Sequence, residues 1–133
     1  MKKLTINELN ILAELLSQCQ NDKDLKSPST IITGIRLTKS VHSCIKKYFE
    51  EQKELFTRFG VEQVEKDGAS YFSWEDKPEN EKSKINQALA ELNSFEYSVE
   101  YLNKIDEEDF IIYTRGLNNP QIVFLYDYLV KED

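Results

Sequence analysis

The stretch that decides the fold is residues 29–60, STIITGIRLTKSVHSCIKKYFEEQKELFTRFG. Before its last residue, Gly60, it contains no proline and a single glycine, Gly34. Its apolar residues recur at helical spacing in two neighbouring stripes. The first stripe contains Ile35, Val41, Ile45, Phe49, Phe56 and Phe59, and the second contains Leu37, Cys44, Tyr48 and Leu55. The stretch therefore predicts one helix of about 45 Å, with a start or a kink at Gly34 and a C-terminal cap at Gly60.

Upstream of this stretch, residues 4–19 have the pattern of a shorter amphipathic helix. Thr5 and Glu8 match a capping box, and Leu4 and Leu9 are spaced as a hydrophobic staple around it. Residues 21–28 are polar and end in a proline, which predicts a connecting loop. The sequence thus begins with two long helices.

Downstream of Gly60 the period changes to that of β-strands. Residues 61–65 and 69–74 are short β-prone runs on either side of Asp67–Gly68, and this arrangement predicts a hairpin. Residues 95–102 alternate strictly, with aromatic side chains and Val99 on one face, and this period predicts a half-buried strand.

The remaining segments predict helices and complete the fold class. The stripe of a short helix consists of Ile85, Leu89 and Leu92. Asp106–Asp109 predicts a helical turn, residues 110–114 are open between strand and helix, and Asn119–Pro120 predicts the start of a last helix. We therefore predict a single α+β domain over residues 1–133. In it, two long N-terminal helices pack with a small antiparallel sheet (the hairpin plus one strand) and a C-terminal helix.

Composition excludes several classes of protein. The chain of 133 residues has 24 acidic and 17 basic side chains, a net charge of −7, two cysteines and one histidine. Two cysteines cannot form a disulfide framework, and a single histidine cannot form a histidine-based metal cluster. No apolar run approaches the roughly 20 residues of a membrane span, and the N-terminal residues lack the apolar region of a signal peptide. We expect a cytoplasmic protein with no membrane contact.

The residues that carry chemistry point to no reaction. His42 lies beside the apolar stripes of the long helix, where we interpret it as a packed or surface side chain. Cys19 and Cys44 fall at apolar helix positions, as buried reduced thiols do. The sequence contains no phosphate-binding loop, nucleophile elbow or dinucleotide fingerprint. We therefore predict no enzymatic activity, no catalytic residues, no metal site and no cofactor.

Charge is distributed unevenly along the chain. Residues 21–60 contain eight basic and five acidic side chains, a balance of +3, whereas residues 61–133 contain seven basic and seventeen acidic ones, a balance of −10. The basic side chains of the long helix are Arg36, Lys39, Lys46 and Lys47, and three glutamates follow them closely. An acidic second half repels nucleic acid and attracts basic protein surfaces. Nucleic acid is therefore an unlikely partner, and a protein is the expected one.

The aromatic residues next to the first acidic cluster are candidates for binding such a partner. Alternation along the predicted strand places Phe72 and Trp74 on one face and Tyr71 on the other. An exposed aromatic side chain among carboxylates would be a binding anchor. The predicted partner-binding residues are Tyr71, Phe72, Trp74, Glu75 and Asp76.

The order of these elements resembles that of small acidic proteins of unknown function encoded by phages and prophages of Gram-positive bacteria. The resemblance lies in the leucine-rich first helix, the segments YFEEQK (48–53) and RFG (58–60), the Asp67–Gly68 hairpin, and the strand at 95–102 with its flanking residues. Arg36 and Lys39 match the basic pair that these proteins carry early in the long helix. The resemblance implies no catalytic residues.

The resemblance and the charge distribution together suggest a function. The first hypothesis is a non-enzymatic phage protein that binds a bacterial protein in the host cytoplasm, as an inhibitor of a host defence system or a regulator of a host factor. The alternative is a virion assembly protein, such as a tail chaperone or a minor structural component.

The second apolar stripe also predicts self-association. A small sheet and one short helix would cover a single stripe, which would leave Leu37, Tyr48 and Leu55 for a two-fold dimer. The competing explanation is that the C-terminal helix folds back and covers this stripe within one chain.

Overall fold

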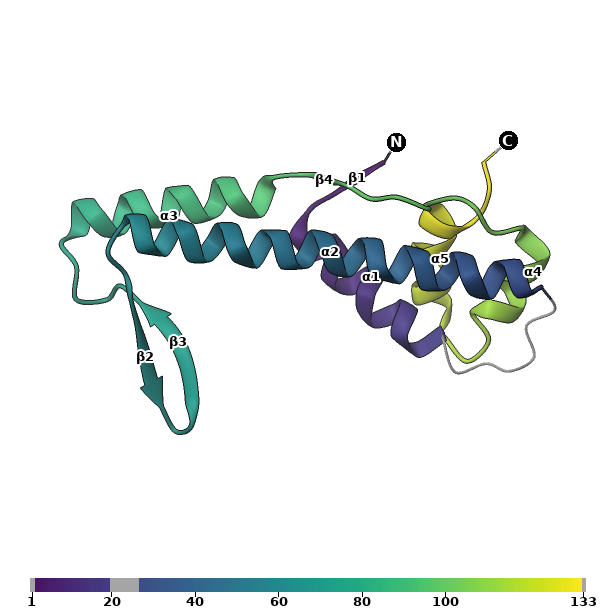
Figure 1. Ribbon diagram of the computed structural model, residues 1–133, viewed down its shortest axis with the longest axis horizontal. Helices are drawn as coiled ribbons and strands as arrows, with labels where there is room; N and C mark the ends of the chain where they lie inside the picture. Colours follow the sequence, from purple (N-terminus) through teal and green to yellow (C-terminus); the bar gives the residue numbers. More distant parts are fainter. Residues whose placement is uncertain (1, 20–26, 133) are drawn as a thin grey trace. The chain divides into compact units, whose positions relative to one another are not determined.

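The computed structural model describes residues 2–19 and 27–132 (Figure 1). In chain order they form β1 (Lys3–Leu4), α1 (Ile6–Cys19), α2 (Pro28–Arg58), β2 (Glu62–Lys66), β3 (Ala69–Ser73), α3 (Glu79–Ser94), β4 (Tyr97–Ser98), α4 (Glu107–Tyr113) and α5 (Asn119–Leu129). The predicted α+β class, with long N-terminal helices and a C-terminal helix, is confirmed. Where the sequence predicts one domain, the contacts form two compact units. Unit 1 is Met1–Ile45 with Glu96–Asp133, and unit 2 is Lys46–Phe95.

The long helix begins earlier than Gly34. Pro28 is the first residue of α2, so its assignment to a loop is wrong; residues 20–26 of that predicted loop lie outside the described residues. Proline is favoured at a helix start because the first N–H groups have no intrahelical acceptor. The carbonyl of Ser27 accepts the N–H of Thr30 at 3.1 Å and closes the first turn. Gly34 lies inside a continuous helix and is buried.

The predicted cap at Gly60 ends α2 in a Schellman motif. Gly60 has a φ of 66°, and its N–H donates to the carbonyl of Thr57 at 3.1 Å. The N–H of Val61 donates to the carbonyl of Phe56 at 2.8 Å. These are the two bonds that define the motif, and the side chains of Val61 and Phe56 share one core cluster, as the motif favours.

Unit 1 is built from α1, residues 28–45 of α2, α4 and α5. Its fully buried side chains come from all of these helices and from the segments between them, and include Leu4, Leu9, Leu12, Leu16, Leu37, Val41, Val99, Ile105, Tyr113, Leu125 and Leu129. A hydrogen bond from Thr30 Oγ1 to Asp109 Oδ2 (3.0 Å) joins α2 to α4. The leucine stripe read from residues 4–19 is therefore core, as predicted.

The predicted strand over 95–102 is wrong in its extent and in its partner. Within the described residues, the strands form two separate antiparallel pairs, β1 with β4 and β2 with β3. In the first pair, Lys3 lies opposite Ser98 and Leu4 opposite Tyr97. Beyond β4 the chain turns, because Tyr101 and Asn103 have φ values of 70° and 58°. The single sheet of a hairpin plus one strand is thus replaced by two sheets, one in each unit.

Unit 2 contains the C-terminal part of α2, the hairpin of β2 and β3, and α3. Figure 1 shows α3 running beside this part of α2, and Tyr48 Oη donates to Asn93 Oδ1 at 2.5 Å between them. Ile85 of the predicted stripe is fully buried. The core cluster consists of Leu55, Phe56, Val61 and Ile85, with Phe59, Phe72, Trp74, Ala88, Leu89 and Leu92 packed against it.

The C-terminal third resolves the segment that the sequence leaves open. Residues 107–113 are α4, so the helical alternative is confirmed for residues 110–113, and Thr114 is the C-cap. The N-cap of α5 is Asn118, one residue before the predicted position. Asn118 Oδ1 accepts the N–H of Gln121 (3.0 Å), and Gln121 Oε1 accepts the N–H of Asn118 (3.0 Å), a reciprocal capping box.

The predicted capping interaction of α1 is present and also reaches α5. Glu8 Oε1 accepts the N–H of Thr5 at 3.0 Å, and Glu8 Oε2 accepts the hydroxyl of Tyr128 at 2.8 Å. The bond from Thr5, followed by the bond from Tyr128, lowers the pKa of Glu8 below its ordinary value of 4.5. The same carboxylate therefore caps one helix and holds the last helix.

Gly34 is required by the close approach of Tyr113. A Cβ at position 34 would lie 2.6 Å from Tyr113 Oη, a buried hydroxyl that has no hydrogen-bond partner among the described residues. We expect Gly34→Ala to lower the free energy of unfolding by about 1–3 kcal/mol, although alanine favours a helix by about 1 kcal/mol. Urea denaturation followed by circular dichroism measures the change.

The Tyr113→Phe background tests whether the contact with the Tyr113 hydroxyl causes the loss of stability in Gly34→Ala. It removes the clashing oxygen together with an unsatisfied buried hydroxyl, so this variant alone should be at least as stable as the natural protein. In that background Gly34→Ala should cost much less. Additive effects of the two changes would contradict the contact.

The lowered pKa of Glu8 makes its contribution depend on pH. We expect Glu8→Gln to lower the free energy of unfolding at neutral pH by about 1 kcal/mol. A carboxyl with a lowered pKa in the folded state stabilises above its unfolded pKa and loses this effect as pH falls through the folded value. The difference between the two proteins should therefore shrink below pH 4.5. Glu14→Gln, on an exposed position of the same helix, is the control; a gap that does not change with pH would refute the prediction.

Candidate functional site

The most exposed element of unit 2 is the hairpin. Every residue of β2 is exposed, and so are the first three residues of β3. Its turn is the predicted one, since Asp67 and Gly68 both have positive φ values (53° and 81°), as a type I′ turn requires. The turn sets the register in which Val64 lies opposite Tyr71 and Gln63 opposite Phe72.

One face of the hairpin attaches it to the helices of unit 2. The ring of Phe72 stacks on that of Phe56, with centroids 4.5 Å apart, and the ring of Trp74 lies 5.4 Å from Phe56. Trp74 Nε1 also donates to Asn86 Oδ1 of α3 at 3.2 Å. Among the five predicted partner-binding residues, Phe72 and Trp74 therefore have a packing role.

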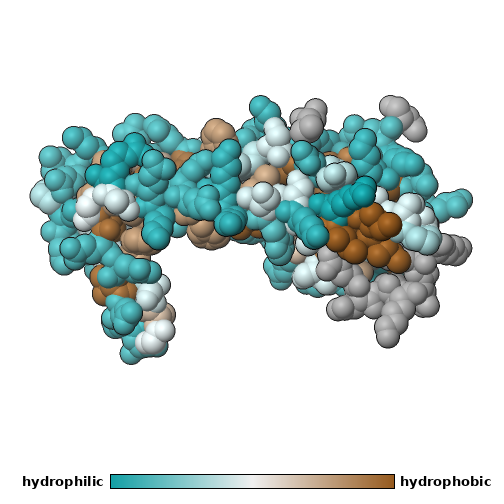
Figure 2. Space-filling model, viewed as in Figure 1, coloured by the Kyte–Doolittle hydropathy of each residue, from teal (hydrophilic) through white to brown (hydrophobic). Residues whose placement is uncertain are grey.

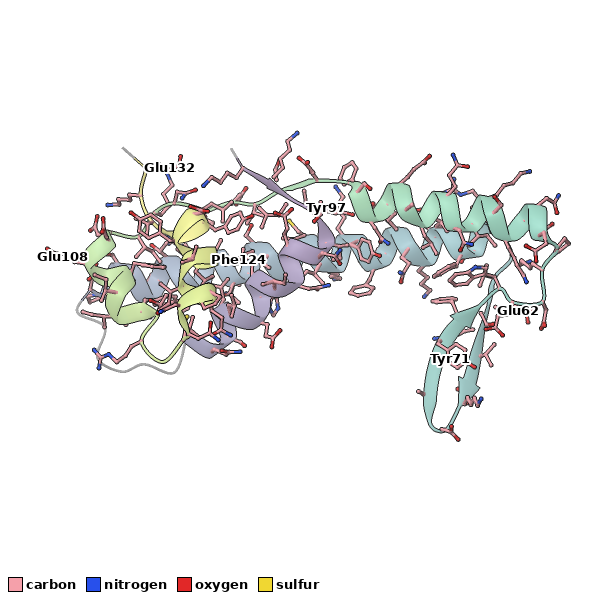
Figure 3. The ribbon with its side chains drawn as sticks, turned by 180° about the vertical axis from the view of Figure 1, so that it is seen from behind. Glu62, Tyr71, Tyr97, Glu108, Phe124 and Glu132 are labelled. Carbon is pink, nitrogen blue, oxygen red and sulfur yellow. The ribbon has the colours of Figure 1, made fainter. Side chains whose placement is uncertain are left out.

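The other face carries an exposed apolar pair. Val64 and Tyr71 are directly opposite each other and are 39% and 44% exposed. Figure 3 shows Tyr71 and Glu62 on the hairpin. The hairpin and the loop that follows it carry five exposed carboxylates: Glu62, Glu65, Asp67, Glu75 and Asp76. Of the predicted partner-binding residues, Tyr71, Glu75 and Asp76 are thus accessible, and we name Val64, Tyr71 and these five carboxylates the hairpin surface.

Both strands of the hairpin also keep an open edge. In the described part of the chain no third strand pairs with β2 or β3. Unpaired N–H and C=O groups along a strand edge are a template for a strand from another chain. The hairpin surface thus combines an aromatic anchor, negative charge and backbone groups that can pair.

The predicted self-association surface is wrong. The side chains of Leu37, Tyr48 and Leu55 are only 0%, 6% and 6% exposed, so this stripe belongs to the cores of the single chain. The stripe is covered within one chain, but at Tyr48 the covering helix is α3 rather than the predicted C-terminal helix, as the bond from Tyr48 to Asn93 shows. Burial raises the pKa of Tyr48, which keeps its phenol neutral.

The exposed apolar surface of α2 lies on another face. Ile31, Ile32 and Ile35 are 42%, 49% and 45% exposed. Figure 2 shows a hydrophobic patch over the N-terminal part of α2. The stripe that contains Ile35 is predicted to face the core, but Ile35 faces solvent.

A third surface surrounds Tyr101 in unit 1. The turn that contains Tyr101 borders a cavity of about 430 Å³, whose lining includes Arg36, Lys39, Ser40, Ser43, Glu100 and Tyr101. We name this cavity the Arg36 hollow. The guanidinium of Arg36 lies 5.9 Å from the centroid of the Tyr101 ring. This site was not predicted, because residues 95–102 have the pattern of a regular strand; the available signal was Asn103, a residue type that favours left-handed turns.

Strongly shifted pKa values belong to groups of unit 1. Burial raises the pKa of the Cys19 thiol to about 11. Burial, assisted by the nearby Cys19, raises the pKa of Tyr113 as well. Burial and the adjacent Glu8 carboxylate raise the pKa of Tyr128 to about 12. These groups stay protonated at neutral pH and serve packing and hydrogen bonding.

Among residues 2–19 and 27–132, no three His, Cys, Asp or Glu side chains are grouped as metal ligands. No helix in the same residues is long and apolar enough to cross a bilayer. His42 is exposed on α2, and Cys44 is partly buried, with its Sγ 3.5 Å from the carbonyl oxygen of Ser98.

No protein-family model matches the chain, and searches of curated proteins and of solved structures find no significant match.

Truncation of an aromatic side chain should affect the stability of unit 2 differently on the two faces of the hairpin. We expect Phe72→Ala or Trp74→Ala to lower the free energy of unfolding of unit 2 by about 2–4 kcal/mol, because each removes a ring packed on the core. Tyr71→Ala should change it by less than about 1 kcal/mol. Hydrogen exchange of the α3 amides measures both. Equal effects of the three changes would mean that the hairpin is attached through both faces.

Proposed function

We propose that this chain is a non-enzymatic, phage-encoded protein that binds a bacterial protein in the host cytoplasm and thereby inhibits a defence system or regulates a host factor. The observation that carries the proposal is the exposed Val64–Tyr71 pair on a two-stranded sheet with open edges. An isolated two-stranded hairpin is only marginally stable in water. In this chain the hairpin is attached to the helices of unit 2 and stays exposed, so it presents backbone groups and an aromatic side chain to a partner.

Charge defines the partner. The hairpin surface has five exposed carboxylates, and Lys66 is its exposed cation between Glu62 and Asp76. Such a surface favours a basic protein face, including the groove in which a host enzyme holds nucleic acid. The expected complex has Tyr71 in a pocket of the partner, a partner strand on one edge of the hairpin, and carboxylates around the contact.

The test compares matched substitutions on the two units. The tagged full chain captures partners from a lysate of a Gram-positive host, and affinity is then measured with the purified, identified partner. Val64→Lys and Tyr71→Lys should each weaken binding about 30-fold, as the loss of a central anchor does. Val123→Lys makes the same change at an exposed position of α5 (67% exposed) and should have no effect.

Salt provides the second measurement. Affinity should fall as ionic strength rises, because exposed charges more than a Debye length apart are screened. The proposal is refuted if the captured partner binds the Val64→Lys and Tyr71→Lys chains as tightly as the natural one. It is also refuted if no specific partner is retained at low salt.

A further inference from the structure

The turn at Tyr101 is held in a costly conformation by bonds on both sides. A tyrosine with a φ of 70° is an outlier, because its Cβ crowds the backbone in the left-handed region. The N–H of Asn103 donates to the carbonyl of Tyr128 at 2.8 Å. Asn103 Nδ2 donates to the carbonyls of Asp127 and Val130 at 2.8 and 2.7 Å. Strained residues that are held in this way are concentrated at ligand sites.

The Arg36 hollow concentrates positive charge in a chain whose net charge is −7. Arg36 and Lys39 lie one helical turn apart on α2 and both line it. Lys39 forms no ion pair with the described residues 2–19 and 27–132. The ring of Tyr101 lies beside the Arg36 guanidinium and restricts its position. One carboxylate, that of Glu100, also lines the hollow.

Hydroxyl donors complete the lining. Ser40 Oγ accepts the N–H of Glu100 at 2.9 Å, which leaves the hydroxyl proton of Ser40 able to donate to a ligand. Ser43 lies one turn further along α2 and lines the same hollow. A guanidinium, an ammonium and two hydroxyls are the donor set that proteins use for the several oxygens of a phosphate group.

We propose that the Arg36 hollow binds the phosphate group of a phosphate monoester, with Arg36 and Lys39 as its charge partners and the Ser40 and Ser43 hydroxyls as donors. A second cavity that Tyr101 also lines is less suitable. There Lys2 is paired with Glu132 at 2.7 Å and also donates to the carbonyl of Asp127. The site lies in unit 1, so it is independent of the hairpin surface in unit 2.

The experiment is an NMR titration of the amides of the full-length chain at pH 7.5 and constant ionic strength. Inorganic phosphate should produce saturable shifts at residues 36–43 and 98–101, and acetate should not. Arg36→Gln and Lys39→Gln should each weaken binding about tenfold. Glu100→Gln should strengthen it, because a like charge is removed. Lys46→Gln removes the same charge from an exposed position of α2 outside the hollow and should leave the affinity unchanged.

Two further probes identify the source of the phosphate. Tighter binding of phosphoserine than of inorganic phosphate assigns the site to phosphorylated side chains, and tighter binding of AMP assigns it to nucleotides; either outcome supports the proposal. Linear, unsaturated shifts up to millimolar phosphate overturn it. Equal losses with Arg36→Gln and Lys46→Gln also overturn it, because they indicate general charge attraction. Since the hairpin is intact in all these variants, partner capture can fail or succeed separately.

Discussion

The buried face of α2 is the constraint on which the rest of the structure depends. Leu37 and Val41 on this face belong to the core of unit 1, and Leu55 and Phe56 belong to the core of unit 2. One continuous helix therefore supplies side chains to two separate cores. The helix can approach α4 closely only because Gly34 has no Cβ against the ring of Tyr113. Most of the stability of such a helix comes from packing of its apolar face rather than from helical propensity.

Local sequence patterns predicted the elements whose causes are local. Gly60 and Asp67–Gly68 occupy the positive-φ positions that their types predict, and the stripe at Ile85 is buried. The pairing of β1 with β4 could not be predicted, because it consists of two residues on each strand and joins segments more than ninety residues apart. The alternation of residues 95–102 correctly placed Tyr97 and Val99 inside. It also placed Phe95 inside, which is 52% exposed, and it gave no sign that the chain turns at Tyr101.

The choice between the two stripes of α2 shows a further limit of pattern reading. Both stripes are apolar and adjacent, so periodicity alone cannot determine which of their residues meet the cores. The structure buries Leu37 and Tyr48 of the second stripe. Of the first stripe it buries Val41 and Phe56 but exposes Ile35 and Phe49. The decision depends on what packs against the helix, such as Asn93 of α3, which accepts a hydrogen bond from Tyr48. The hairpin and its acidic surroundings could be predicted from the sequence. The Arg36 hollow could not, because it forms only when the chain turns at Tyr101.

The register of the hairpin connects its packing role with its binding role. Side chains alternate between faces, so a shift of one residue in the pairing would exchange Phe72 and Tyr71. Asp67–Gly68 prevents this shift, because a two-residue type I′ turn fixes Lys66 opposite Ala69 and therefore Val64 opposite Tyr71. Phe72 is apolar and stacks on Phe56, whereas Tyr71 carries a hydroxyl that remains solvated. A turn of two residues thus determines which aromatic side chain holds the hairpin in place and which one is available to a partner.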